Sequence, residues 1–187
     1  MAARVFVITG PSGVGKGTLI RDLRGRMPEL ELSVSATTRE PREGEKHAVD
    51  YHFLSADDFA RRADEGDFLE HATFSGNRYG TLRSEIKRTL DAGSSVVLEI
   101  EVQGARQVRA AMGDEAVLIF IAPPDPASLR ERLSGRGTDS REAIERRLET
   151  AKQELEAQQE FKHVVVNEVL DMAANELADI VRHELDV

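Results

Sequence analysis

A glycine-rich segment near the start of the chain has the residue types that bind phosphate groups. It reads Gly10-Pro11-Ser12-Gly13-Val14-Gly15-Lys16 and matches the pattern G-x-x-x-x-G-K. Glycines let backbone N–H groups turn inward around phosphate oxygens, and the lysine side chain reaches the β- and γ-phosphates of a nucleotide. The alternative interpretation is a glycine-rich turn between a strand and a helix that binds nothing.

The residues that follow this loop bear on metal binding. Gly17 stands where the general pattern has a serine or threonine for Mg²⁺, and the hydroxyl comes one position later, at Thr18. We therefore expect no metal site built from protein side chains. Mg²⁺ would be held mainly through nucleotide oxygens and water, with Thr18 as the hydroxyl that the loop offers. The sequence GKGT is similar to the loops of nucleoside monophosphate kinases.

A polar segment over residues 35–53 is a second candidate anion site. Arg39 and Arg42 are three residues apart, among hydroxyl side chains and close to Tyr51. Arginine forms two parallel hydrogen bonds to a phosphate, so this pair suits an anion. On composition alone, a solvated loop is the favoured interpretation of this segment.

The elements that must position these residues follow from the hydrophobic pattern. Short apolar runs at 5–8, 96–100, 117–121 and 164–166 predict buried strands, with a further strand at 68–72 and a turn at 76–80. Helical spacing predicts helices at 19–27, 55–63, 82–91, 103–112, 125–134, 140–155 and 171–185. Strands that alternate with helices predict an α/β fold with a parallel sheet.

Further motifs connect these segments to a known family. They are SATTREPREGE at 35–45, DYHF at 50–53, Glu70, GNRYGT at 76–81, Gln103-Gly104 and Arg136-Gly137-Thr138. In this order and spacing, the whole chain resembles guanylate kinase, a nucleoside monophosphate kinase of the P-loop superfamily. The resemblance implies a three-layer α/β/α fold with a parallel central sheet, an inserted flap that binds the monophosphate, and a small lid. It implies one domain over residues 1–187, with a core at 1–34, 85–133 and 148–187, the flap at 35–84 and the lid at 134–147.

The resemblance also implies the reaction and the residues that perform it. The expected reaction is Mg²⁺-dependent transfer of a phosphoryl group from ATP to GMP, with dGMP as an alternative acceptor. Catalytic roles fall to Lys16, Arg39, Arg136 and Arg147. ATP would bind to Gly10, Pro11, Ser12, Gly13, Val14, Gly15, Lys16, Gly17, Thr18 and Asn167. GMP would bind to Ser35, Arg39, Arg42, Tyr51, Glu70, Tyr79, Thr81 and Glu99.

The chemistry of guanine agrees with a role for Glu70. Guanine has two adjacent donors, N1–H and the 2-amino group, and an ionised carboxylate accepts both. Adenine has an acceptor at N1, which a carboxylate repels. Glu99 and Glu101 resemble an acidic pair of the family, although relatives often have aspartate where this chain has Glu101.

The mechanism that this pattern favours needs little acid–base chemistry. A phosphate monoester has a second pKa near 6, so the GMP phosphate is mostly dianionic at pH 7 and attacks without a strong base. The catalytic task is to neutralise charge on the transferring group, which lysine, arginine and Mg²⁺ do.

Composition narrows the remaining choices. The net charge of −9 and the lack of a basic stripe argue against nucleic-acid binding, and the chain has no cysteine. The N-terminal apolar stretch is too short for a signal peptide, and no run is long enough to span a membrane, so we expect a cytoplasmic protein. The sequence does not decide between a monomer and a homo-oligomer. It also leaves two alternative functions, a kinase that phosphorylates another small acceptor and a non-catalytic scaffold.

Overall fold

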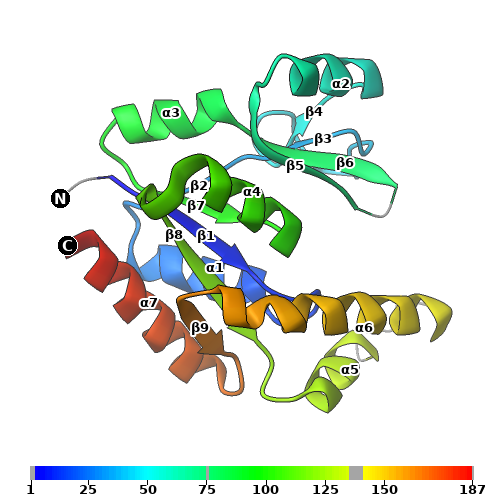
Figure 1. Ribbon diagram of the computed structural model, residues 1–187, viewed down its shortest axis with the longest axis vertical. Coiled ribbons are helices and arrows are strands. Elements are labelled where there is room, and N and C mark those ends of the chain that lie inside the picture. Colours follow the sequence, from blue (N-terminus) through cyan, green and yellow to red (C-terminus); the bar gives the residue numbers. More distant parts are fainter. Residues whose placement is uncertain (1–2, 75, 135–140, 187) are drawn as a thin grey trace.

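The central sheet contains five parallel strands in the order β2-β7-β1-β8-β9 (Figure 1). The computed structural model describes residues 3–74, 76–134 and 141–186. The strands are β1 (Val5–Thr9), β2 (Glu31–Leu32), β7 (Val96–Glu99), β8 (Ala116–Ala122) and β9 (His163–Val166). All residues of β1 and β8 are buried, because helices cover both faces of the sheet and each strand is therefore a continuous apolar run.

Helices form a layer on each face of this sheet. The helices are α1 (Lys16–Arg26), α3 (Arg83–Asp91), α4 (Val102–Met112), α5 (Pro126–Ser134), α6 (Arg141–Glu156) and α7 (Leu170–Asp186), with short 3₁₀ turns η1 (Gly113–Glu115) and η2 (Ala157–Glu160). Side chains of α1 and α7 pack in one core cluster with Phe6 and Ile8. Side chains of α3 and α4 pack in a second cluster with Val5 and Val7 on the opposite face. The predicted α/β fold with a parallel sheet between helical layers is confirmed.

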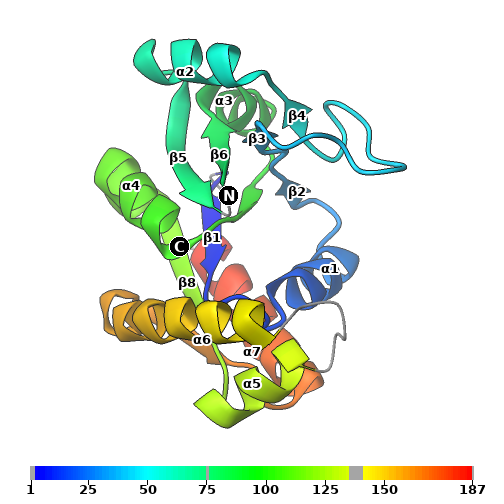
Figure 2. The same cartoon turned by 90° about the vertical axis from the view of Figure 1, so that its right-hand side faces the viewer.

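A second, smaller sheet lies apart from the first, with the strand order β4-β3-β6-β5. Its strands are β3 (Ala36–Thr37), β4 (His52–Phe53), β5 (Phe68–Phe74) and β6 (Asn77–Leu82), and helix α2 (Ala56–Asp64) covers it. Phe59 of α2 stacks on Phe68 of β5 with ring centroids 4.4 Å apart, in a separate core cluster. Figure 2 shows this sheet and α2 at one end of the molecule, and α5 and α6 at the other.

Most predicted elements are present within one to three residues of their expected limits, and two predictions need correction. Residues 76–80 were expected to form a turn. Of these only Gly76 lies in a turn, whereas Asn77–Leu82 is strand β6 and pairs with β5. Pairing across the sheet outweighs the turn preference of glycine and asparagine here. The two-residue strand β2 was not expected, because Glu31–Leu32 has no pattern that marks it.

The helices α2 and α5 begin directly after the residues that the sequence predicts as their N-terminal caps. Ser55 Oγ accepts a hydrogen bond from the Asp58 N–H at 3.1 Å, and Asp125 Oδ1 accepts one from the Ser128 N–H at 2.8 Å.

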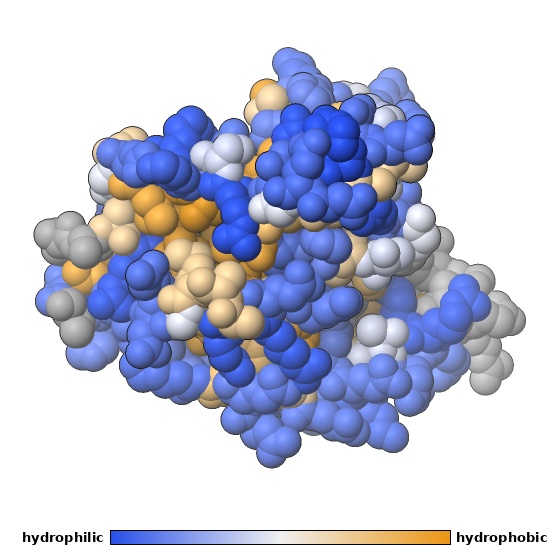
Figure 3. Space-filling view, turned by 45° about the horizontal axis from the view of Figure 1, so that its top comes forward, coloured by the Kyte–Doolittle hydropathy of each residue, from blue (hydrophilic) through white to orange (hydrophobic). Residues whose placement is uncertain are grey.

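Hydrophilic residues cover most of the molecular surface that Figure 3 shows. Within the described part of the chain, no helix has the length and apolar character needed to cross a membrane.

Candidate active site

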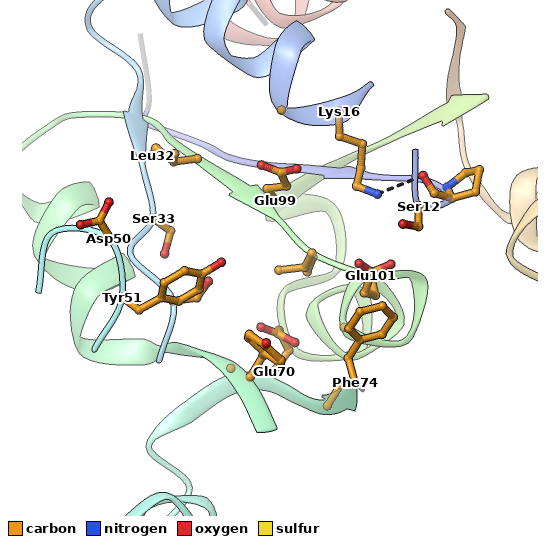
Figure 4. A pocket seen from close by; sticks show the side chains of 18 of the residues that line it. Ser12, Lys16, Leu32, Ser33, Asp50, Tyr51, Glu70, Phe74, Glu99 and Glu101 are labelled. Atoms are coloured by element: carbon orange, nitrogen blue, oxygen red, sulfur yellow. Dashed lines mark hydrogen bonds between the residues drawn. The ribbon is translucent and has the colours of Figure 1, made fainter. Parts of the chain in front are cut away.

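A cleft of about 610 Å³ lies between the glycine-rich loop and the second sheet. One wall comes from residues 11–13 and 15–18, and the other includes Tyr51, Glu70 and Tyr79. Glu99 and Glu101, at the carboxyl end of β7, form part of the lining between them. In Figure 4, Glu99 lies between Lys16 and Tyr51. The topology therefore brings the glycine-rich loop to one cavity with Tyr51 of the second candidate anion site, at the edge where parallel sheets bind ligands.

The glycine-rich loop has a backbone that other residues would not adopt. Gly10 has φ 143°, and a Cβ atom there would overlap the carbonyl oxygen of Ile121. Gly15 has φ 102° and ends the loop directly before α1, which starts at Lys16. The positive end of the α1 helix therefore faces the loop, as in sites that bind phosphate.

The side chain of Lys16 folds back and donates hydrogen bonds to the start of the glycine-rich loop. Its ammonium group is buried and donates to the carbonyl oxygens of Gly10 and of Pro11, the latter at 3.3 Å (Figure 4). These neutral acceptors hold a positive charge inside the loop without cancelling it. A buried ammonium group beside a glycine-rich loop that leads into a helix suits a polyanion.

Two residues from outside the glycine-rich loop, Asn167 and Arg132, donate hydrogen bonds to its Val14 carbonyl. Asn167 Nδ2 donates to the Val14 carbonyl at 2.8 Å, and Arg132 Nη1 donates to the same oxygen at 3.0 Å. Arg132 Nη2 also donates to the Asn167 carbonyl at 2.7 Å. Arg132 was not among the predicted site residues. It lies in an arginine-rich stretch over residues 130–147, which was the only signal for it.

The region expected to act as a lid reaches the loop through α6. Arg147 Nη2 donates to Ser12 Oγ at 2.7 Å, so this predicted catalytic arginine contacts the phosphate-binding loop. Arg136, the other arginine assigned to the lid, lies outside the described residues.

On the acceptor side, Arg39 is held by a carboxylate and by aromatic rings. Its Nη2 donates to both oxygens of Glu45, at 2.9 and 3.0 Å, and its guanidinium carbon lies 5.2 Å from the ring centroid of Tyr51. The hydrogen bond from Arg39 lowers the pKa of the Glu45 carboxyl group. The rings of Tyr51 and Tyr79 meet edge to face, with centroids 6.3 Å apart. Burial raises the pKa of Tyr51, so its hydroxyl stays a hydrogen-bond donor.

Arg42 contacts the same glutamate, Glu45, through its main chain. Its N–H donates to Glu45 Oε2 at 2.8 Å, whereas its side chain is exposed. Glu45 therefore bridges the side chain of Arg39 and the main chain of Arg42. Sequence analysis did not single out Glu45, although it belongs to the motif SATTREPREGE.

Glu70 is a buried carboxyl group with a defined partner. Its side chain is 5% exposed, and Oε1 accepts a hydrogen bond from Thr81 Oγ1 at 2.6 Å. Burial raises the pKa of Glu70, and hydrogen bonds from the Thr81 hydroxyl and N–H act in the opposite direction. A Cβ atom on Gly104 would overlap Glu70 Oε2, so glycine at that position is what admits the carboxylate.

Near Lys16 lie three glutamates, Glu99, Glu101 and Glu154. Sequence analysis did not predict Glu154 as a site residue. Burial raises the pKa of Glu99, and the charge of Lys16 opposes this shift. Glu154, on α6, interacts with Glu101, and the buried Oε2 atoms of these two acids have no other hydrogen-bond partner among the described residues. Burial, followed by the hydrogen bond to Glu101, raises the pKa of Glu154 to about 8, so the pair retains a proton at neutral pH. A glutamate in an amphipathic helix gives no sign of this in the sequence.

The structure brings most of the predicted residues to the cleft but not all of them. Those that line it are Pro11, Ser12, Gly13, Gly15, Lys16, Gly17, Thr18, Ser35, Tyr51, Glu70, Tyr79 and Glu99. The other described residues assigned to the site, which do not line it, are Gly10, Val14, Arg39, Arg42, Thr81, Arg147 and Asn167. Among the described residues, no cluster of three or more acidic, histidine or cysteine side chains has the arrangement of a metal site.

Comparisons with known proteins agree with this geometry. The family model described as Guanylate kinase matches residues 2–184. The guanylate kinase of Synechococcus sp. (strain CC9311) is 53% identical over 175 residues, which cover 94% of this chain and 92% of the relative. The guanylate kinase of Thermobifida fusca (strain YX) is 51% identical over 178 residues, covering 95% and 90%. The crystal structure of guanylate kinase from Anaplasma phagocytophilum superposes with a TM-score of 0.78 at 33% identity, covering 98% of this chain and 86% of that one.

Proposed function

The chain belongs to the guanylate kinase family and phosphorylates GMP with ATP, and we propose that the two nucleotides meet in the cleft described above. ATP would bind with its phosphates on the loop at residues 10–18. GMP would bind against the second sheet, with its phosphate directed toward the loop. The lining of the cleft supports this proposal, since Lys16 and Glu70 face one cavity.

The observation that carries the proposal is the buried carboxyl group of Glu70. A carboxylate that accepts from the Thr81 hydroxyl has further lone pairs for the N1–H and 2-amino donors of guanine. These two donors would favour the ionised form and offset the effect of burial on the pKa of Glu70. Adenine has an acceptor at N1 and no amino group at C2, so it offers the carboxylate no donor at these two positions, which discriminates strongly against AMP. Ser35, which also lines the cleft, would contact the same base.

The phosphate of GMP would bind to Arg39, Arg42, Tyr51 and Tyr79. Glu45 would be displaced from Arg39 when the phosphate arrives, so one anion replaces another. Because Glu45 already holds the Arg39 side chain in place, the rotamer entropy of that arginine is largely lost before GMP binds. This arrangement would lower the entropic cost of binding the phosphate.

The reaction is an in-line displacement. An oxygen of the GMP phosphate forms a bond to the γ-phosphorus of ATP, the bond from that phosphorus to the β–γ bridging oxygen breaks, and ADP leaves. Lys16, Arg39, Arg136 and Arg147 would neutralise the charge on the transferring group. A dianionic phosphate needs no strong base, so Glu99 would serve to orient the acceptor.

The oxygen ligands around the loop fit Mg²⁺. The Thr18 hydroxyl and the carboxyl groups of Glu99 and Glu101 line the cleft and are hard donors of the kind that Mg²⁺ prefers. When bound with ATP, Mg²⁺ supplies positive charge at the β- and γ-phosphates. We propose that it is held mainly by nucleotide oxygens and water, with Thr18 as the protein ligand.

The remaining assignments follow from the same arrangement. Asn167, which fixes the Val14 carbonyl, would lie near the adenine of ATP. Residues 35–84 would act as the flap and 134–147 as the lid, and both would close over the nucleotides to exclude water. With dGMP, the base and phosphate contacts would be the same, so we propose it as a second acceptor.

A coupled assay of ADP formation tests the function. With ATP and Mg²⁺ present, GMP should stimulate ADP formation far more than AMP, UMP or gluconate. Omission of Mg²⁺ should abolish the stimulation. Equal rates with and without GMP would contradict the proposal, and stimulation by another acceptor alone would identify a different small-molecule kinase.

A further inference from the structure

Strand β5, which carries Glu70, has one edge that no strand of the described residues covers. It lies at the end of the second sheet and pairs with β6 on its inner side. On its outer side it contacts helix α4, as Figures 1 and 2 show. The position of Glu70 relative to the rest of the cleft therefore depends on the contact between β5 and α4.

Gln107 of α4 makes this contact with the main chain of β5. The His71 N–H donates to Gln107 Oε1 at 3.1 Å, and Gln107 Nε2 donates to the His71 carbonyl at 2.8 Å. An amide side chain has one donor group and one acceptor, so it satisfies both main-chain groups of His71 as a neighbouring strand would. This pair fixes the residue directly after Glu70.

The same face of α4 contacts the carboxyl group of Glu70. Gly104 lies three residues before Gln107, so the two residues share a face of the helix. A Cβ atom on Gly104 would overlap Glu70 Oε2, which shows how closely the helix approaches the carboxylate. A change in the distance between α4 and β5 would therefore move the carboxylate within the cleft.

Pairing with β6 does not fix this segment completely. The register between β5 and β6 shifts between Phe68 and Glu70, so the ladder is irregular immediately before the carboxylate. His71 is then opposite Gly80, where no side chain packs from β6. The hydrogen bonds to Gln107 hold the strand on the side away from this irregular ladder.

We propose that Gln107 is a positioning residue for guanine recognition. It holds the main chain of His71 against α4 and so places the Glu70 carboxylate where it meets N1–H and the 2-amino group of guanine. The inference rests on the proposed function of Glu70. A displaced carboxylate would lose binding to the base while the phosphate sites stay intact, because these lie on other segments of the chain.

The test compares GMP with IMP, which lacks the 2-amino group. The variants are Gln107→Met, which keeps the length of the side chain without its hydrogen bonds, and Gln159→Met, a matched control at an exposed glutamine. At saturating ATP, Gln107→Met should lower the ratio of kcat/KM for GMP to that for IMP by about 10-fold. The loss should come from a higher KM for GMP, with the KM for ATP within about two-fold of the parent, since the ATP site is untouched.

A second variant separates positioning from folding. Gln107→Glu keeps the acceptor for the His71 N–H but cannot donate to the His71 carbonyl when ionised, so an intermediate ratio is expected. If an active Gln107 variant has a lower melting temperature but the GMP-to-IMP ratio of the parent, Gln107 is only a structural contact and the inference is overturned. A parent protein without GMP-dependent ADP formation would instead overturn the proposed function.

Discussion

The carboxyl group of Glu154 is hydrogen-bonded to that of Glu101, so α6 and the start of α4 meet through two acids beside the phosphate-binding loop. Two carboxyl groups form such a bond only when one of them is protonated. The pair makes the stability of this protein depend on pH in a specific direction.

Glu154→Gln should remove that dependence. The folded protein holds the proton up to about pH 8, whereas the unfolded chain releases it near pH 4.5, so this contribution is full below pH 4.5 and is lost as the pH rises to 8. Thermal melting at pH 5 and pH 8.5 checks this. The variant should gain a few degrees relative to the parent at pH 8.5, since about 2–4 °C corresponds to 1 kcal/mol at this size. Parallel pH profiles for the parent and Glu154→Gln would contradict the account, and exposed Glu149→Gln is the control.

Lys16→Met should abolish most turnover while the protein stays folded. The buried ammonium group donates to two carbonyl oxygens of the loop, and a single positioned cation in phosphoryl transfer is worth about 10³–10⁵ in rate. ADP formation and a melting curve measure the two effects separately. Lys152→Met, at an exposed position on α6, should behave as the parent does. Turnover within ten-fold of the parent in a folded Lys16→Met protein would refute the assignment.

Arg39→Ala should weaken GMP binding in particular. Loss of a guanidinium group that forms two charge-assisted hydrogen bonds predicts an increase of about 10–100-fold in the KM for GMP. Arg61→Ala is the matched control, because Arg61 also pairs with a glutamate, Glu65, but on the exposed side of α2. Steady-state kinetics with varied GMP give the answer, and equal KM values for the two variants would reject the phosphate site.

Glu184 on α7 carries a separate prediction about stability. It accepts hydrogen bonds from Lys162 and His163, both at 2.9 Å, and from Arg4 at 3.2 Å. The hydrogen bond from Lys162 is the main cause of its lowered pKa. Because the folded pKa is depressed, this contribution is present above the unfolded pKa near 4.5 and is lost as the pH falls through the folded value.

Glu184→Gln should therefore lower the free energy of unfolding at pH 7 by about 1–2 kcal/mol, since Lys162 is exposed and its share is screened. Urea unfolding at pH 7 and pH 3 measures this difference, which should shrink at pH 3. Glu176→Gln, on the exposed side of the same helix, supplies the control. A difference that is as large at pH 3 as at pH 7 would exclude the ionic explanation.

The sequence predicts the elements of the core well for a physical reason. Strands such as β1 and β8 are buried on both faces, so their apolar runs are unambiguous, and the glycine-rich loop matches a specific motif. The strands of the second sheet are harder to predict from the sequence. β6 has the composition of a turn, and its strand character comes from its partner β5, which local sequence does not encode.

Candidate residues divide in the same way. Lys16 belongs to a motif that chemistry explains, and Glu70 was identified through the resemblance to a known family. Glu154, Arg132 and Gln107 act through partners that are far away in the sequence, and the three-dimensional arrangement alone reveals them.

Isothermal titration with a bisubstrate analogue, adenosine and guanosine joined through a phosphate chain, tests most directly whether one cleft holds both nucleotides. The account predicts one analogue per chain, an affinity well above that of ATP or GMP alone, and weaker binding in both Lys16→Met and Arg39→Ala. An analogue that binds no more tightly than one nucleotide, or that loses affinity in only one of the two variants, would contradict it.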